Sequence, residues 1–229
     1  LDRCALLRTV NHNVIDEHGA ATNRVHTGRP PTGTITYPSI GSIVAQQLGD
    51  KATAVPPYVV MGYPSVSRGP GFLGAKYGYL YLTDTERGPA GVQRSSDVDD
   101  ARQQRREALL KSFRGEPTAA DARVTQYAAA AESAFHLMEP SFMNVFDLKS
   151  EAAKLRESYG GEFGQRCLLA RRLVEAGTKC VEVSFNLNFI NGTGWDTHNE
   201  GQKNQHLLIE QLDQAMAGLI NDLESRKRL

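Results

Sequence analysis

Apolar residues occur along this chain in two patterns, and each pattern predicts a different element. Short apolar runs indicate strands that are covered on both faces of a sheet. Three such runs span residues 4–10, 58–61 and 179–185. Longer segments repeat apolar residues every three or four positions, which predicts amphipathic helices. Because these helices alternate with the strands, the pattern favours an α/β protein built on a parallel sheet.

Glycine and serine mark the ends of the predicted helices. Ser39 is a typical N-cap for a helix that Gly49 ends. The apolar face of this helix, expected to meet the core, consists of Ile40, Ile43, Val44 and Leu48. A clear amphipathic helix over residues 164–176 leads into the strand at 179–185, as in a parallel sheet with crossover helices. One long helix with an apolar core stripe is predicted over residues 201–229.

The middle of the chain has a different composition. Residues 62–91 are rich in Gly, Pro, Tyr and Ser, which predicts a long irregular segment or a small excursion from the sheet. Residues 97–138 are helical in composition, and a Gly-Glu-Pro-Thr stretch divides them into two helices. Residues 141–159 predict a further helical hairpin. We interpret residues 84–162 as a predominantly helical insertion that lies beside the sheet, within a single domain spanning residues 1–229.

Charge and length narrow the range of partners. The chain has 229 residues, with 26 Lys and Arg against 26 Asp and Glu, so its net charge is zero. A balanced charge indicates no nucleic-acid partner, and no apolar run approaches the roughly 18 residues that a membrane span needs. The chain begins without Met and ends within a helix, which predicts a domain that is incomplete at both ends. A third hypothesis is that such a piece has no activity of its own. It is expected to expose sheet edges and to be poorly soluble or self-associating.

Candidate chemistry falls on the Gly-rich turn that follows the strand at 179–185. Asp196 and His198 lie there, at the carboxyl end of the strand, where ligands bind in open α/β sheets. A carboxylate and an imidazole are ligands that a divalent metal takes in a hydrolytic site. The alternative is a helix-capping Asp and a surface His. His12 and His18 follow the first predicted strand. Parallel strands end at the same edge of a sheet, so the two groups are expected to meet.

Several stretches resemble a known bacterial family. Ala-Arg-Arg-Leu-Val-Glu-Ala-Gly at 170–177 and Gly-Trp-Asp-Thr-His at 194–198 are similar to domain-of-unknown-function family 1501 (DUF1501), often labelled sulfatase-like. Shorter pieces that fit the same family lie at residues 37–42, 56–60, 70–74, 159–160 and 163–165. The resemblance covers nearly the whole chain. It implies an alkaline phosphatase-like α/β fold, with a mostly parallel sheet flanked by helices.

The resemblance also implies an activity and a site. Its superfamily contains sulfatases, phosphatases and cofactor-independent phosphoglycerate mutases. The implied function is therefore metal-dependent hydrolysis of phosphate or sulfate esters, with a small-molecule or carbohydrate ester as substrate. The implied ion is zinc, calcium or manganese, and its expected ligands are Asp196, His198 and His12. His18 falls at the position of the sulfatase nucleophile, and it is the expected catalytic residue, as a ligand or a base.

The resemblance leaves the nucleophile open and implies a location, and there is an alternative to a catalytic function. Because His18 stands where sulfatases carry a Cys or Ser, a hydroxyl would come from another residue, with Thr22 and Ser39 as candidates. Members of the family commonly carry an export signal, which implies a periplasmic, cell-envelope or secreted location. The alternative to a hydrolase is a non-catalytic binding or structural protein of the cell envelope that keeps the fold.

Overall fold

The fold is built on a small parallel sheet. The structure is a computed structural model, and it describes residues 3, 5–15, 17–31, 33–49, 55–89, 95, 97–114, 137–138, 140–187, 193–198 and 200–229. Within these residues the sheet has three strands in the order β2–β1–β3, namely β1 (Tyr58–Met61), β2 (Leu80–Leu82) and β3 (Cys180–Val183). Both pairings are parallel, with Val59 opposite Leu80 and Val181. The predicted α/β class with a parallel sheet is therefore confirmed.

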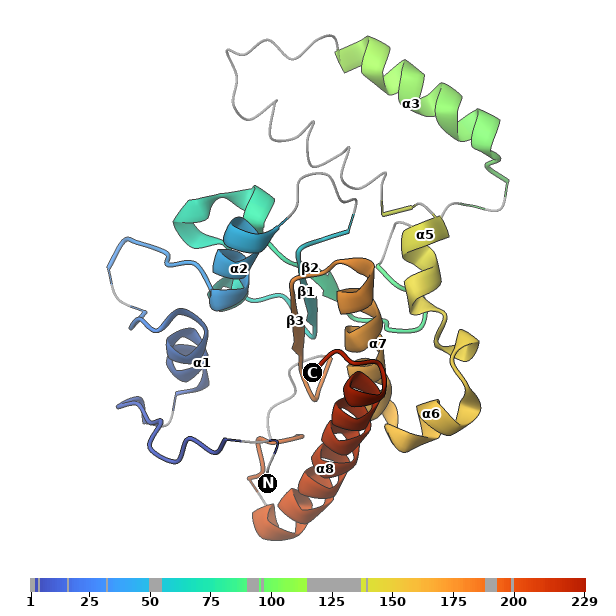
Figure 1. Cartoon of the computed structure of the whole chain (residues 1–229). Coiled ribbons are helices and arrows are strands. Elements are labelled where there is room, and N and C mark those ends of the chain that lie inside the picture. The colour runs from blue at the N-terminus through green and yellow to red at the C-terminus, as the bar shows by residue number, and fades with distance from the viewer. Residues whose placement is uncertain are drawn as a thin grey trace.

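Helices cover both faces of the central strand (Figure 1). The helices on one side are α1 (His18–Thr27) and α2 (Ile40–Leu48), and those on the other are α7 (Glu162–Ala176) and α8 (Gly201–Ser225), which packs against α7. All four residues of β1 are buried, as its continuous apolar run predicts. Val59 and Met61 pack in one cluster with Leu173 of α7. Tyr58 and Val60 pack in another cluster, on the side of α2.

α2 meets the sheet with its small residues, which corrects the predicted orientation. The large apolar residues expected to face the core are exposed or half-buried: Ile40, Ile43, Val44 and Leu48. The buried positions are instead Gly41, Ser42 and Ala45. The reason is steric, because the ring of Tyr58 lies against the helix, and a Cβ on Gly41 would be 2.3 Å from that ring. Ser39 caps α2 as predicted, and Gly49 ends it.

Gly41→Ala tests this close contact. The added methyl group has no room beside the Tyr58 ring, so we expect the substitution to lower the free energy of unfolding by about 1–3 kcal/mol, the usual cost of overpacking. Gly161→Ala is the control, because Gly161 precedes α7 and a Cβ there meets no atom within 4 Å. Urea unfolding followed by circular dichroism measures both variants. Equal stability of the two variants would contradict the contact.

The predicted strand at residues 4–10 does not form. Residue 4 lies outside the described part of the chain, and residues 5–10 have no regular structure. Leu6, Leu7 and Val10 are 78%, 77% and 79% exposed. An apolar run becomes a buried strand only where it pairs with another strand, and within the described residues this run pairs with none of the three strands of the sheet. The prediction was wrong because an apolar run does not form a strand unless the fold brings it alongside a sheet edge, and residues 5–10 are not paired with β2 or β3.

Residues 62–91 hold more regular structure than their composition predicts. Three short 3-10 turns precede β2, namely η1 (Val66–Arg68), η2 (Gly71–Leu73) and η3 (Ala75–Tyr77). β2 follows within the same segment and pairs with β1 along its whole length. The composition did not indicate this strand, because three residues are too few to show a period-two pattern.

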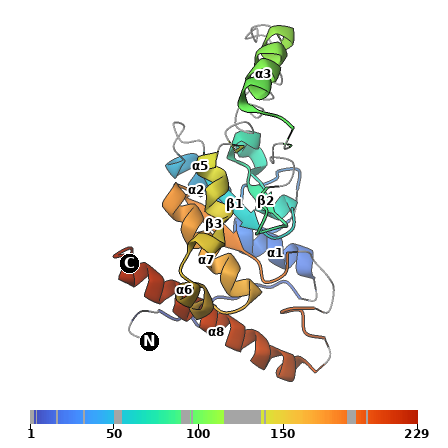
Figure 2. The ribbon, with the colours of Figure 1, turned by 90° about the vertical axis from the view of Figure 1, so that its right-hand side faces the viewer.

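The helical block at residues 84–162 has two parts. α3 (Asp100–Arg114) stands apart from the sheet (Figures 1 and 2). The helix predicted after it falls in residues 115–136, outside the described part of the chain. The second part contains α5 (Pro140–Met143), η4 (Asn144–Phe146), η5 (Leu148–Ser150) and α6 (Ala153–Ser158). Phe142 and Phe146 of this part are buried in the same cluster as Met61 of β1, so it belongs to the core of the domain.

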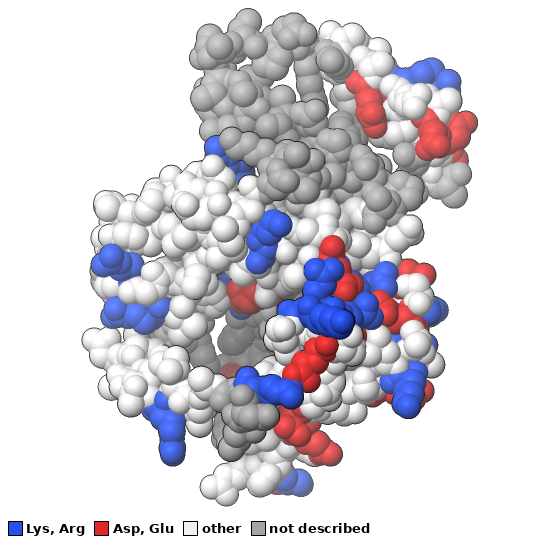
Figure 3. Space-filling model, in the orientation of Figure 1, with Lys and Arg blue, Asp and Glu red and all other residues white. Residues whose placement is uncertain are grey.

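α7 and α8 form the outer layer on one side of the sheet. α7 ends at Gly177, where φ is 118°, as its sequence predicts. α8 buries Leu208 and Ala215, but Leu212 and Met216 of the predicted core stripe are partly exposed. Basic and acidic side chains lie next to one another over α6, α7 and the C-terminal end of α8 (Figure 3). Within the described residues, the structure contains no helix with the length and apolar character of a membrane span.

Candidate metal centre

Two histidines and an aspartate from distant parts of the chain come together at one point. Donor atoms of His18, Asp196 and His198 all lie within 4.8 Å of one another. The Nε2 atoms of His18 and His198 are 3.2 and 2.9 Å from the same oxygen, Oδ1 of Asp196. Two atoms bound to one tetrahedral zinc ion are about 3.3 Å apart, because each bond is about 2.0–2.1 Å long. The distances to Asp196 are those of hydrogen bonds, and they are also close to the spacing of two ligands on a single ion.

The first residue of α1 supplies one of these side chains. Glu17 is the N-cap of the helix, and its carboxylate accepts from the backbone N–H of Ala20 at 3.0 Å, so the helix begins at His18. The side chain of His18 is 64% exposed. The sequence predicted that His18 would reach Asp196 from the end of a strand at residues 4–10. The structure brings the two residues together through the start of a helix instead.

The loop between β3 and α8 supplies the other two side chains. The backbone N–H of Asp196 donates to the carbonyl oxygen of Thr193 at 3.2 Å, which closes a turn. Gly194 lies in this turn with φ 60°, a value that favours glycine. The carboxylate of Asp196 is 15% exposed, whereas the imidazole of His198 is 52% exposed. The cluster therefore has a sheltered carboxylate and two imidazoles that are open to solvent.

The donor set suits an ion that accepts nitrogen ligands. Neutral imidazole and carboxylate are ligands of catalytic zinc sites, which have three protein ligands and keep one position open. Calcium takes about six to eight oxygen ligands, and Asp196 is the one oxygen donor of this cluster. Among the three ions predicted from the family resemblance, the residues present fit zinc best and manganese next.

Two other predicted site residues have different surroundings. His12 is exposed, and its Nδ1 accepts from the backbone N–H of Val14 at 3.1 Å. It is not part of the cluster around Asp196. Ser39 is fully buried, and its hydroxyl donates to the carbonyl oxygen of Arg68 at 2.7 Å. A buried capping hydroxyl has no access to a substrate, so Ser39 does not serve as the nucleophile.

A charged cluster on β3 was not predicted. Glu182 lies within this strand, and its Oε1 is 2.5 Å from Nε of Arg68 and 3.0 Å from Nε2 of His26. Its Oε2 accepts from the hydroxyl of Tyr58 at 3.0 Å. Burial alone would raise the pKa of Glu182, but the hydrogen bonds from His26 and Arg68 outweigh burial and lower the pKa to about 2. The sequence did offer one signal for this cluster, a charged residue inside an apolar strand. Buried charges are nearly always paired, so Glu182 needed a partner.

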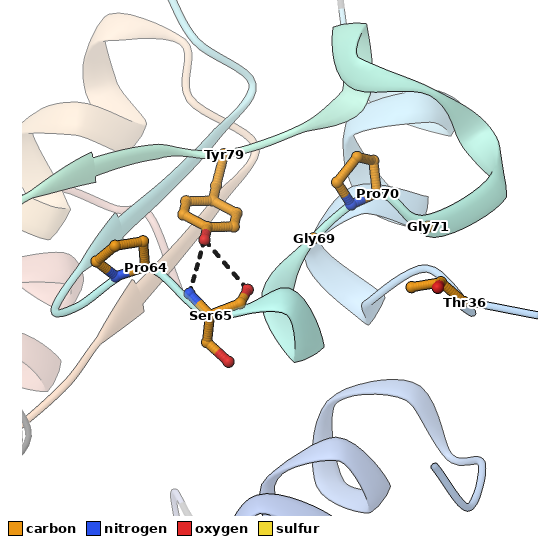
Figure 4. A pocket seen from close by; sticks show the side chains of 7 residues that line it. All are labelled: Thr36, Pro64, Ser65, Gly69, Pro70, Gly71 and Tyr79. Atoms are coloured by element: carbon orange, nitrogen blue, oxygen red, sulfur yellow. Dashed lines mark hydrogen bonds between the residues drawn. The ribbon is translucent and has the colours of Figure 1, made fainter. Parts of the chain in front are cut away.

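A shallow cavity of about 530 Å³ lies between the segment after β1 and the segment before α2 (Figure 4). Its lining residues are Thr36, Pro64, Ser65, Gly69, Pro70, Gly71 and Tyr79. The hydroxyl of Tyr79 accepts from the backbone N–H of Ser65 at 2.8 Å and donates to the Ser65 carbonyl oxygen at 3.1 Å, so it closes one wall. This lining contains no charged side chain and no residue of the Asp196 cluster. We therefore assign no chemistry to the cavity.

The fold and the cluster together define an α/β protein with a candidate divalent-metal centre beyond the carboxyl end of an edge strand. Comparison with known families identifies the particular group. The chain belongs to the family DUF1501, described as "Protein of unknown function (DUF1501)", which matches residues 1–229. The family resemblance of the stretches at 170–177 and 194–198 is thereby confirmed. No curated protein and no solved structure matches the chain.

Proposed function

We propose that this chain carries the metal centre of a hydrolase of phosphate or sulfate esters with an alkaline phosphatase-like fold. The observation that carries the proposal is the cluster of His18, Asp196 and His198. Its place beyond the carboxyl end of β3 supports the proposal, because ligands bind at such ends in open α/β sheets. The sulfatase-like character of the family resemblance supports the choice of ester.

Asp196 is the central ligand in this proposal. Its Oδ1 faces both imidazoles, so it directs their Nε2 atoms toward one point. His198 and His18 are the other two ligands. We assign His18 as a ligand, because its donor atom lies within 4.8 Å of the donor atoms of both Asp196 and His198. A bound divalent ion polarises the ester oxygen and offsets the negative charge of the transition state.

The exposure of the cluster fits a substrate that arrives from solvent. Both imidazoles are more than half exposed, which leaves room for a small-molecule or carbohydrate ester beside them. We propose a periplasmic or cell-envelope location on the strength of the family resemblance. One observation favours the rival function, a non-catalytic metal-binding protein of the envelope: Ser39, one of the two candidate hydroxyls, is buried as a helix cap.

Zinc binding by the wild type and by His198→Ala tests the centre. We expect the wild type to bind zinc with the stoichiometry of a single site. We expect His198→Ala to weaken binding by more than about 100-fold, since losing even an outer-shell partner costs about 10–100-fold. His206→Ala is the matched control, because His206 is an exposed histidine of α8 outside the cluster. Isothermal titration calorimetry on the metal-free proteins measures all three affinities.

Hydrolysis of p-nitrophenyl phosphate and p-nitrophenyl sulfate then separates the two functions. Turnover that requires the ion and disappears in His198→Ala supports the hydrolase. Ion binding without turnover of either ester supports the rival function. The metal proposal is wrong if the wild type binds none of zinc, manganese and calcium. His12→Ala belongs in the same series, because a loss as large as that of His198→Ala would make His12 a further ligand.

A further inference from the structure

His26 connects α1 to the sheet. It lies in the last turn of α1, and its side chain is 15% exposed. Its Nε2 is 3.0 Å from Oε1 of Glu182 on β3. Its Nδ1 is 2.7 Å from the carbonyl oxygen of Thr22, one turn earlier in the same helix. Both ring nitrogens therefore face an oxygen atom.

These two contacts determine the protonation state of His26. A carbonyl oxygen accepts hydrogen bonds and does not donate them, and the same holds for an ionised carboxylate. Glu182 is ionised, because Arg68 and Tyr58 also donate to it. Both nitrogens of His26 must then donate, and only the imidazolium form carries two N–H groups. A positive charge in the last turn of α1 is also favourable to the helix dipole.

The groups that face His26 come from three other elements. β3 supplies Glu182, and η1 supplies Arg68, whose positive charge opposes that of His26. Tyr58 of β1 shares the carboxylate of Glu182. The hydrogen bond to Glu182 outweighs both burial and the Arg68 charge, so the pKa of His26 lies above its usual value.

We propose that His26 and Glu182 form a clasp that holds α1 on the sheet and so positions His18 in the metal centre. The proposal rests on the proposed function. α1 is one short helix from His18 to Thr27, so an anchor in its last turn determines where its first residue lies. His18 meets Asp196 in the loop that follows β3, and Glu182 is part of β3 itself. His26 and Glu182 are positioning residues, because they lie outside the cluster.

The contribution of the clasp falls as pH rises, whereas metal binding by itself is favoured at higher pH. Because the folded-state pKa of His26 is raised, its contribution is fully present below about pH 6.5, the usual histidine value, and is lost as pH rises through the raised pKa. A neutral His26 has one N–H, so either Glu182 or Thr22 loses its donor. The ligand imidazoles bind an ion only when they are neutral, which favours binding at higher pH. A fall in zinc affinity as pH rises above about 6.5 would therefore report on the clasp.

His26→Gln and His26→Lys test the clasp with zinc as the probe. Glutamine is neutral and cannot donate to Glu182 and Thr22 as imidazolium does, so we expect about tenfold weaker zinc binding, the low end of the loss for outer-shell partners. Lysine keeps the charge up to about pH 10. We expect it to restore most of the affinity and to remove the fall that accompanies rising pH. Calorimetric titrations between about pH 6.5 and pH 9, with His206→Gln as control, measure these effects.

His26→Gln in a His18→Ala background separates an effect on the position of His18 from a general effect on the fold. If the clasp acts through His18, His26→Gln changes the remaining zinc affinity by less than about twofold there. A tenfold loss that persists without His18 would show that His26 acts on the whole domain, and it would overturn the proposal. Unchanged affinity of His26→Gln in the otherwise wild-type protein would overturn it as well.

Hydrogen exchange tests the clasp without any metal. His26→Gln is expected to speed the exchange of α1 amides at least about tenfold and to leave the amides of β1 unchanged, because local opening follows the loss of local contacts. Equal exchange of α1 in both proteins would overturn the clasp. A wild type that binds no zinc, together with faster α1 exchange in His26→Gln, would contradict the proposed function and support the clasp.

Discussion

Replacing Glu182 by leucine is expected to lower the free energy of unfolding by about 3 kcal/mol at neutral pH, the low end of the cost of removing one partner from a buried ion pair. The carboxylate accepts from Arg68, His26 and Tyr58 at 2.5, 3.0 and 3.0 Å. Leucine has a similar volume, but it leaves the positive charges of Arg68 and His26 facing each other away from bulk water. Urea unfolding followed by circular dichroism measures the change.

Acid is expected to remove the contribution of Glu182 to the free energy of unfolding. The pKa of Glu182 is about 2 in the folded protein, against an ordinary value of 4.5. A carboxylate with a lowered pKa contributes stability that is fully present above the unfolded-state pKa and is lost as pH falls through the folded-state pKa. The difference in stability between the wild type and Glu182→Leu should therefore narrow between pH 4.5 and about pH 2.

The control for this prediction is Glu210→Leu. Glu210 is exposed on α8, so its replacement is expected to change the free energy of unfolding by less than about 0.5 kcal/mol at any of these pH values. A loss in Glu182→Leu as small as that of the control would show that the charged cluster on β3 contributes little to stability.

Asp222→Ala is the second substitution with a large expected effect, a loss of about 3 kcal/mol or more. Asp222 is 4% exposed, and Tyr159 and Arg226 donate to its carboxylate at 2.9 and 2.6 Å. Nε of Arg171, a buried residue of α7, lies 2.9 Å from the same carboxylate. Alanine would leave the Tyr159 hydroxyl without its acceptor and the Arg171 guanidinium without one of its acidic partners, and both groups are costly to leave unpaired.

Thermal unfolding of Asp222→Ala beside Asp213→Ala measures this effect. Asp213 is exposed on the same helix, so its replacement is expected to stay within about 0.5 kcal/mol of the wild type. Asp222→Asn keeps one oxygen for Tyr159 and is expected to fall between the two. Equal unfolding midpoints for the Asp222 and Asp213 variants would mean that α7 and α8 are held together by apolar packing alone.

The central elements could be predicted from the sequence because their signals are local. β1 is a continuous apolar run, and α7 ends at a glycine in the left-handed conformation. Two of the errors depend on contacts between distant segments. Residues 5–10 have the composition of a strand, but they do not pair with either edge strand of the sheet. α2 has a large apolar face, but the Tyr58 ring selects the opposite face with Gly41.

In the candidate site, too, local signals could be predicted from the sequence and contacts between distant segments could not. Asp196 and His198 could be identified because a strand precedes their Gly-rich turn and a helix follows it. The family resemblance identified His18 as a catalytic residue, but the sequence could not show how it approaches Asp196, since that depends on where α1 lies. Glu182 was hidden within an apolar run, and its partners Arg68 and His26 are far away in the sequence.

The face of α2 that meets the sheet, made of Gly41, Ser42 and Ala45, also limits how the sequences of family members can diverge. Ile40 and Leu48 point to solvent, so exchanges at these positions cost the fold little. Gly41 lies against the Tyr58 ring with no room for a methyl group, so a larger residue at position 41 requires a smaller one at position 58. Over evolutionary time the residues at positions 41 and 58 are therefore expected to change together, while the exposed positions of α2 are expected to vary independently.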